Sequence, residues 1–248
     1  GLSLTGKIAF INSFAVFTTG RNYDQLRQSI CTANLNVKIN GSSAGLSDFG
    51  DGATHQSVED IAIMRALPNM TVLVPADGLE TKKAVEATVN HDGPVYIRIT
   101  RSECDEITPM DQVFTIGQPY VLREGHDVAI FACGIMVQKS IKAAEKLADM
   151  GISARVVNVS SLKPLDEDAV KYAAEGVKGV ITAEEHSVIG GLTAAIAYIL
   201  RGRAIPLEPV AIMDKFGQSA QSLEELLEFY GLTQQDIVKA AVNMLQKK

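Results

Sequence analysis

The stretch Val37–Ala66 reads VKINGSSAGLSDFGDGATHQSVEDIAIMRA, and its three parts differ in composition. Val37–Ile39 is a short β-branched run typical of a strand, and Val58–Ala66 has the apolar spacing of a helix. Between them, Gly41–Gln56 is rich in glycine, which disfavours regular structure because ordering it costs backbone entropy. We therefore expect a bent loop between a strand and a helix, with an acid, a hydroxyl, an imidazole and an amide within its last six residues.

The same alternation of strand and helix continues on both sides of this loop. The predicted strands of the first half are Ile8–Ile11, Val37–Ile39, Thr71–Val74 and Val95–Ile99, and the predicted helices are Arg21–Ala33, Val58–Ala66 and Gly78–His91. Ser57 with Asp60, and Asp77 with Glu80, have the spacing of a capping box at a helix start.

A second alternating set follows a proline-containing segment. Its predicted strands are Asp127–Ala132, Ala154–Val159, Gly179–Thr182 and Glu208–Ile212, and its predicted helices are Val137–Met150, Asp166–Ala174, Gly191–Arg201, Leu223–Tyr230 and Thr233–Gln246. The pattern predicts the α/β class, with two doubly wound, mostly parallel-sheet domains at residues 1–105 and 123–248 and a linker at residues 106–122.

Net charge and cysteine content bear on the classes of partner and site that the chain can have. A formal net charge of −6 over 248 residues gives no support for a nucleic-acid or anionic-membrane partner. Three widely separated cysteines fit a reduced cytoplasmic chain and show no metal-ligand spacing. The opening GLSLTGK has Gly6 as a helix-ending residue, so we expect an N-terminally truncated first domain that begins in the last turn of a helix.

Nine segments, in order along the chain, carry a family resemblance. They are Ser13–Phe17, Arg21–Arg27, Gly41–Gln56, Val58–Ala62, Arg65–Pro68, Pro75–Asp77, Ile97–Arg101, Leu162–Asp166 and Glu184–His186. Together they resemble the pyrimidine-binding and C-terminal domains of transketolase, a thiamine diphosphate enzyme. The family's diphosphate-binding domain has no counterpart here, which is similar to split transketolases, where that domain is a separate subunit.

The resemblance implies the C-terminal subunit of a split transketolase, which moves a two-carbon ketol unit between sugar phosphates, as in the pentose phosphate pathway. Thiamine diphosphate would supply the electron sink, while the protein orients the reactants. An N-terminal partner subunit would hold the diphosphate with Mg or Ca. The implied assembly is a homodimer or a heterotetramer.

The resemblance also assigns residues to the cofactor. Phe14 and Phe17 match the family's aromatic wall against the aminopyrimidine ring, which needs an apolar slot. Burial in an ordinary core is the alternative for both. His55 matches a catalytic position between cofactor and substrate, where an imidazole can exchange a proton near neutral pH.

Three further positions match substrate contacts. Asp51 corresponds to an acceptor for a sugar hydroxyl, and Arg101 to the arginine that holds the sugar phosphate. Ser43 stands where many transketolases carry a substrate-binding histidine, which leaves the donor sugar open. The catalytic glutamate is expected upstream of Gly1, so the chain as given should not catalyse the reaction alone. Gly50–Gly52 resembles the start of a thiamine-enzyme metal motif, but the required asparagine pair is missing, so we expect no metal ligand here.

Other functions remain open. A deoxyxylulose-phosphate synthase or the beta subunit of a 2-oxo-acid dehydrogenase would use the same cofactor. A non-catalytic assembly module would keep the fold without the activity.

Overall fold

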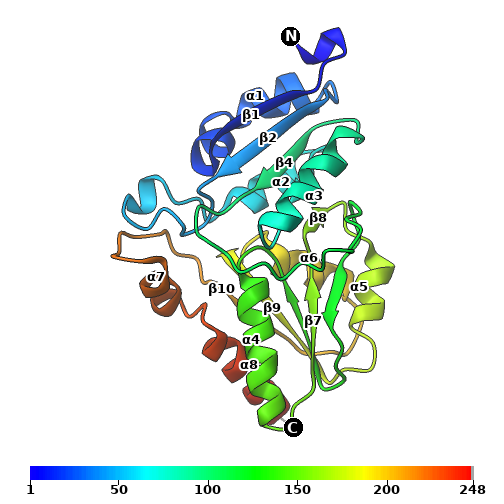
Figure 1. Cartoon of the computed structure of the whole chain (residues 1–248), viewed down its shortest axis with the longest axis vertical. Helices are drawn as coiled ribbons and strands as arrows, with labels where there is room; N and C mark the ends of the chain where they lie inside the picture. Colours follow the sequence, from blue (N-terminus) through cyan, green and yellow to red (C-terminus); the bar gives the residue numbers. More distant parts are fainter. Residues whose placement is uncertain (247–248) are drawn as a thin grey trace.

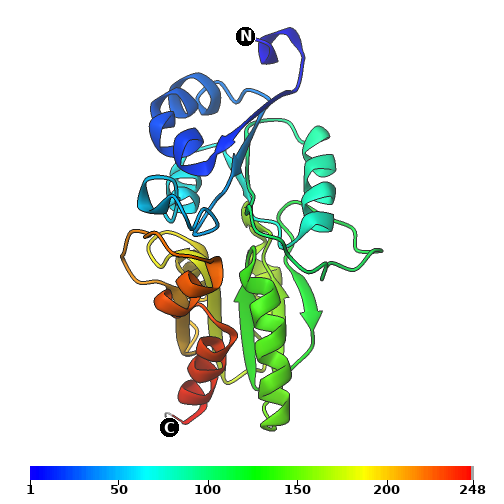
Figure 2. The same cartoon turned by 60° about the vertical axis from the view of Figure 1, so that its left-hand side comes forward.

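Two five-stranded sheets form the framework of the molecule, and they are stacked along its long axis (Figures 1 and 2). The computed structural model describes residues 1–246. The first sheet has the order β1 (Ala9–Phe14), β2 (Val37–Ser42), β4 (Val95–Arg98), β3 (Thr71–Leu73) and β8 (Ser161–Lys163). The second has the order β10 (Leu207–Ile212), β9 (Gly179–Ser187), β6 (Val128–Ala132), β7 (Ala154–Asn158) and β5 (Tyr120–Arg123). The predicted fold class is confirmed.

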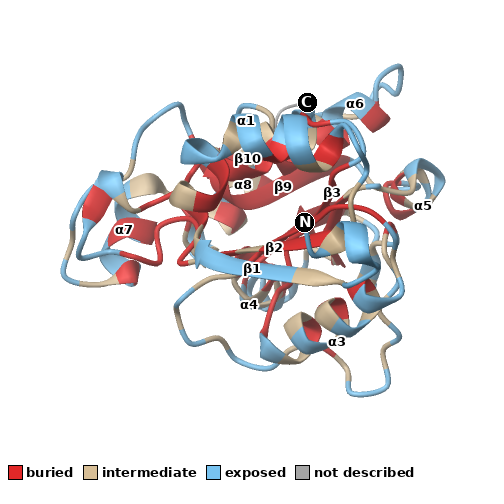
Figure 3. Cartoon of the chain, turned by 90° about the horizontal axis from the view of Figure 1, so that it is seen from above, coloured by how far each residue is buried: buried red, intermediate tan, exposed pale blue. Residues whose placement is uncertain are grey.

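Each sheet is parallel except for one edge strand. β8 pairs antiparallel with β3, and β5 pairs antiparallel with β7. Neither of these short strands was predicted. At the opposite edge of the first sheet, β1 is mostly exposed, whereas the strands behind it are buried (Figure 3).

β8 comes from the second half of the chain but completes the sheet of the first half. Val72 lies opposite Lys163, and Leu73 lies opposite Ser161. The Lys163 ammonium donates to the carbonyls of Arg65 and Leu67, at the end of α2 (Asp60–Ala66). The two sheets are therefore joined by backbone pairing as well as by side-chain packing.

The helical segments of the first half lie around its sheet. They are η1 (Ser3–Thr5), η2 (Phe17–Arg21), α1 (Tyr23–Gln25), η3 (Leu26–Cys31), η4 (Gly52–Thr54), α2 and α3 (Gly78–Val89). Of these, η1 has no buried residue and η4 lies within the Gly41–Gln56 loop. The predicted helix Arg21–Ala33 is present only as a series of π-helical and short α-helical turns that starts earlier, at Phe17. Thr18 and Thr19 donate their hydroxyls to the Ala15 carbonyl, which competes with regular helical bonding.

The two predicted capping pairs behave differently. Asp77 accepts a hydrogen bond of 2.7 Å from the Glu80 amide, so this helix start is confirmed. The Ser57–Asp60 prediction is wrong, because α2 begins after Glu59 without a side-chain cap. The Asp60 carboxylate is used instead by Tyr96 and Arg98 in the buried interior.

The second sheet is covered by helices on both faces (Figure 1). They are α4 (Met136–Asp149), α5 (Glu167–Ala173), α6 (Leu192–Ile199), α7 (Leu223–Tyr230) and α8 (Gln234–Gln246). All five predicted helices of this half are found, and no end is shifted by more than two residues. Among the helices of residues 1–246, none is long and apolar enough to cross a membrane.

Candidate active site

The carboxyl ends of three parallel strands meet at one edge of the first sheet. Phe14 ends β1, Ser43 directly follows β2, and Arg101 lies three residues after β4. Ligands of open α/β sheets bind at this edge, because loops that leave it can diverge around a crevice. The Gly41–Gln56 loop starts here, so the fold brings the predicted residues to one region.

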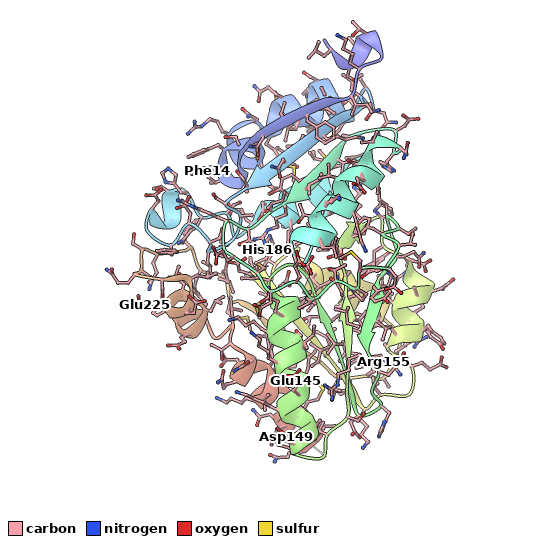
Figure 4. All side chains as sticks on the ribbon, viewed as in Figure 1. Phe14, Glu145, Asp149, Arg155, His186 and Glu225 are labelled. Atoms are coloured by element: carbon pink, nitrogen blue, oxygen red, sulfur yellow. The ribbon has the colours of Figure 1, made fainter. Side chains whose placement is uncertain are left out.

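Phe14, Phe17 and His55 form an aromatic group. The two phenylalanine rings are nearly parallel, with centroids 5.9 Å apart. The His55 ring stands edge-on to both, at 5.9 Å from Phe14 and 5.3 Å from Phe17. All three side chains are half-buried, and Phe14 lies at the end of β1 beside the site loop (Figure 4). An aromatic face that is partly open suits a flat heterocycle better than a closed core would.

Two neighbours fix the edges of this group. His55 Nδ1 lies 2.9 Å from the Thr54 hydroxyl, and the His55 amide donates to the Gly52 carbonyl. The Arg21 guanidinium lies over the Phe17 ring at 4.6 Å from its centroid, which is a cation–π contact. The sequence resemblance gave Arg21 no role in the site.

A cavity of about 500 Å³ lies beside the same loop. It is lined by Ser47, Asp48, Phe49, Gly50, Asp51, Arg101 and Ser102. The structure thus places Asp51 and Arg101 around one cavity. Ser43 does not line it: this residue is buried and has φ of +51°, a strained value for a non-glycine residue.

Asp48 is a site residue that the sequence analysis missed. Its Oδ1 lies 3.1 Å from Nη1 of Arg101, and its side chain is buried while that of Arg101 is 62% exposed. Asp48 lies within the Gly41–Gln56 segment, but the resemblance gave it no substrate or cofactor contact. An extra acid between the loop's glycines was the available signal, but spacing alone could not show which cation it meets.

The second domain holds the site loop at three points. Glu185 Oε1 accepts a hydrogen bond of 2.7 Å from the Leu46 amide. Gln56 Nε2 donates to the Gln218 carbonyl at 3.0 Å, and the Ala220 amide donates to the Phe49 carbonyl at 2.9 Å. Because a glycine-rich loop has little side-chain packing of its own, these contacts fix its shape.

A buried ionic cluster lies under the loop. The Arg98 guanidinium contacts Asp60 Oδ2 at 2.9 Å and Glu185 Oε2 at 3.6 Å, and the Tyr96 hydroxyl donates to Asp60 at 2.6 Å. One cation thus faces two carboxylates. Burial raises the pKa of Glu185 to about 7, and the Arg98 charge opposes that rise only in part.

His186 and the turn at Phe131–Gly134 lie in the interior, whereas the side chain of His126 is 80% exposed. His186 lies between the domains (Figure 4), where Nδ1 is 2.7 Å from the Ser187 carbonyl and Nε2 accepts from the Ala62 amide. The amides of Cys133 and Gly134 donate to the carbonyls of Ala183 and Val74, so they are not free to bind an anion.

The residues present fit one part of thiamine diphosphate. The half-open face of Phe14 and Phe17, with the His55 ring nitrogens nearby, suits its aminopyrimidine ring. Within residues 1–246, no group of three or more His, Cys, Asp or Glu side chains is placed to hold a metal ion.

Comparison with known proteins identifies both halves of the chain. The model of the transketolase pyrimidine-binding domain matches residues 1–106, and that of the transketolase C-terminal domain matches residues 117–237. The chain is 44% identical to 6-deoxy-6-sulfo-D-fructose transketolase subunit SqwH of Clostridium sp. strain MSTE9, over 100% of this chain and 77% of that protein. It is 35% identical to an apulose-4-phosphate transketolase subunit of Phocaeicola vulgatus, over 100% of this chain and 79% of that protein.

A solved structure extends the likeness to three dimensions. It is a split-gene transketolase in the form of an inactive β4 tetramer, with a TM-score of 0.89 and 46% sequence identity, over 99% of this chain and 78% of that chain.

Proposed function

The chain belongs to the transketolase family, and we propose that it is the C-terminal subunit of a split transketolase that transfers a two-carbon ketol unit between sugars with thiamine diphosphate. The observation that carries this proposal is that an aromatic group and a cavity both adjoin the Gly41–Gln56 loop: Phe14, Phe17 and His55 form the group, and Asp51 and Arg101 line the cavity.

We assign the cofactor ring to the aromatic group. Phe14 and Phe17 bind the aminopyrimidine and exclude water from it. When bound, thiamine diphosphate supplies the electron sink that carbon–carbon bond cleavage requires. His55 Nδ1 is engaged by the Thr54 hydroxyl, so Nε2 is the atom that exchanges a proton with a sugar oxygen.

We assign the sugar to the cavity. Asp51 accepts a hydrogen bond from a sugar hydroxyl, and the planar guanidinium of Arg101 holds the charged end of the sugar. Ser43 directly follows β2 at the loop's start, and we keep it as a candidate substrate contact although it does not line this cavity. The relatives act on different sugars by their names, so the family leaves this chain's substrate open.

The proposal includes a partner. An N-terminal subunit with the diphosphate-binding domain would hold the diphosphate and its Mg or Ca ion, and the assembly would be a homodimer or a heterotetramer. Two features support it: relatives that match over the whole of this chain are named as transketolase subunits, and the related split-gene β4 tetramer is an inactive form.

A ketol-transfer assay tests the function. The complete gene product is mixed with its N-terminal partner, thiamine diphosphate and Mg, and assayed with phosphorylated and sulfonated ketoses as donors and ribose 5-phosphate as acceptor. We expect turnover only in the full mixture. We also expect His55→Asn to lower kcat by about a hundredfold or more, as for loss of a general acid–base group.

The opposite results point to the other functions. Activity with pyruvate and an aldose phosphate, or decarboxylation of a 2-oxo acid without ketol transfer, would identify one of the other thiamine enzymes. Cofactor binding without any turnover would identify an assembly module. Phe17→Ala is the control for cofactor binding, since it should raise the Kd for thiamine diphosphate without changing the assembly.

A further inference from the structure

The cavity beside the site loop has a negative charge balance. Three of its lining residues are charged at neutral pH, namely Asp48, Asp51 and Arg101. One positive and two negative charges give a formal sum of −1. A cavity that binds a doubly charged phosphate usually offers an excess of cations, so this balance needs an explanation.

The two residues of the Asp48–Arg101 ion pair differ in how far their side chains are buried. The Asp48 side chain is only 4% exposed, whereas that of Arg101 is 62% exposed. Asp48 Oδ1 lies 3.1 Å from the guanidinium, and Oδ2 is buried and makes no hydrogen bond within residues 1–246. Arg101 is therefore the cation on which a buried, incompletely bonded carboxylate depends.

The loop keeps Asp48 in place. Its carbonyl accepts a hydrogen bond of 3.2 Å from Gln56 Nε2, and Gln56 is itself bound to the second domain. The hydroxyl of Ser47, the preceding residue, accepts from the Arg101 amide at 3.2 Å. Asp48 thus cannot follow the arginine toward a ligand, and an anion that draws the guanidinium away leaves Asp48 without its counter-charge.

We propose that Asp48 is a specificity-determining residue that makes this cavity select a sugar with a singly charged end over one with a doubly charged phosphate. The proposal rests on the proposed function of the cavity. A guanidinium has five N–H donors, so it can bind a singly charged oxyanion while it keeps its bond to Asp48. The second charge of a phosphate meets two carboxylates and no second cation among the lining residues of the described chain.

The Asp48→Asn variant in the complete enzyme provides the test. Asparagine keeps the shape and one acceptor oxygen for Arg101 but removes the charge. The readout is the ratio of kcat/KM for fructose 6-phosphate to that for 6-deoxy-6-sulfofructose, two donors of similar shape. We expect this ratio to rise about tenfold. Cations that the partner subunit adds act on both enzymes alike, so they cancel in the comparison.

A control variant and two contrary outcomes make the Asp48→Asn experiment decisive. Asp105→Asn removes an exposed acid that pairs with Lys142 outside the cavity, and it should leave the ratio unchanged. If Asp48→Asn lowers kcat/KM equally for both donors, Asp48 only orients Arg101 and the proposal is overturned. A ratio that stays within twofold of the wild-type ratio overturns it as well.

A second measurement needs no variant. The second ionisation of a phosphate monoester has a pKa of about 6, whereas a sulfonate keeps one charge throughout. In the wild-type enzyme, the phosphate-to-sulfonate ratio should therefore rise severalfold between pH 7.5 and pH 5.5, and a flat ratio contradicts the proposal. In Asp48→Asn the rise should be smaller.

A binding experiment separates this proposal from the proposed function. Inorganic phosphate and methanesulfonate are titrated at pH 7.5 while the Arg101 side-chain N–H resonance is followed by NMR. We expect Asp48→Asn to bind phosphate about tenfold more tightly than the wild type does, with little change for methanesulfonate. Equal phosphate affinities would refute the charge selection even if ketol transfer is found. If no ketol transfer is found, the titration still decides it.

Discussion

The carboxyl edges of the two sheets have the same architecture but different uses. At the first sheet, the residues after β1, β2 and β4 lead to a half-open aromatic group and a cavity. At the second sheet, β6 leads to Cys133 and β9 ends in Glu184–Ser187, and the side chains of Cys133, Glu184 and Glu185 are buried. The edge that usually binds ligands is covered in the second sheet by the first domain. What lies opposite an edge therefore decides whether it is a site or a contact surface.

The two edges are also linked. Glu185, from the covered edge, bonds the Leu46 amide in the loop of the open edge, and Arg98 connects both to Asp60. The covered edge thus serves as the base on which the site loop rests. Three changes should separate the two roles.

Arg98→Met should have the largest effect, because it leaves two buried carboxylates without a cation. We expect a loss of about 3–5 kcal/mol in the free energy of unfolding, measured by urea denaturation. Lys142→Met is the matched control, since it breaks an exposed pair with Asp105 and should cost less than about 1 kcal/mol. A loss for Arg98→Met as small as that of the control would show that the cluster does not stabilise the contact.

The second-largest effect should be the pH dependence of the free energy of unfolding. Burial raises the pKa of Glu185 from 4.5 to about 7, so the folded chain keeps a proton that the unfolded chain has released over this range. The folded state binds more protons, and the free energy of unfolding should therefore fall by roughly 3 kcal/mol as pH rises from 4.5 to 7. Arg98 on β4 and Asp60 on α2 face this carboxyl with opposite charges.

The Glu185→Gln variant tests whether Glu185 causes this fall in the free energy of unfolding with rising pH. Glutamine still accepts from the Leu46 amide but cannot ionise, so urea midpoints measured between pH 4.5 and 8 should lose most of this decline. A variant with the wild-type slope would assign the pH dependence to other groups.

Ser43→Gly should have the smallest effect and the opposite sign. Ser43 has φ of +51° at the open edge, and glycine adopts this conformation without the Cβ strain. We expect stability to rise by about 1 kcal/mol in urea denaturation. Ser42→Gly is the control, because Ser42 lies at the end of β2 and glycine should destabilise a strand there. If both variants lose stability equally, Ser43 carries no strain.

Sequence patterns predicted most strands and helices but not the antiparallel edge strand of each sheet. Val95–Ile99 and Gly179–Thr182 are runs rich in β-branched residues, and they are found as β4 and the start of β9. Ser161–Lys163 has only three residues, and its pairing with β3 depends on a contact between distant parts of the chain. At the π-helical turn Phe17–Arg21, the hydroxyls of Thr18 and Thr19 bond to the Ala15 carbonyl, which helical periodicity does not report.

The candidate site shows the same limit. Motif matching selected Phe14, Phe17, His55, Asp51 and Arg101, and the structure places them around one loop, although their roles stay predictions. Asp48 was missed because its importance comes from burial beside Arg101, and burial is a property of the fold. The Ser57–Asp60 cap was wrong because a buried arginine and a tyrosine bind that carboxylate.

The pairing of β8 with β3 also orders events during synthesis. The ribosome synthesises residues 71–73 before residues 161–163. The outer edge of β3 therefore has no paired strand until β8, in the second half of the chain, has been made. An unpaired strand edge is a template for association with other chains. In the growing chain, this edge of the first domain therefore stays open to such association until the second domain supplies residues 161–163.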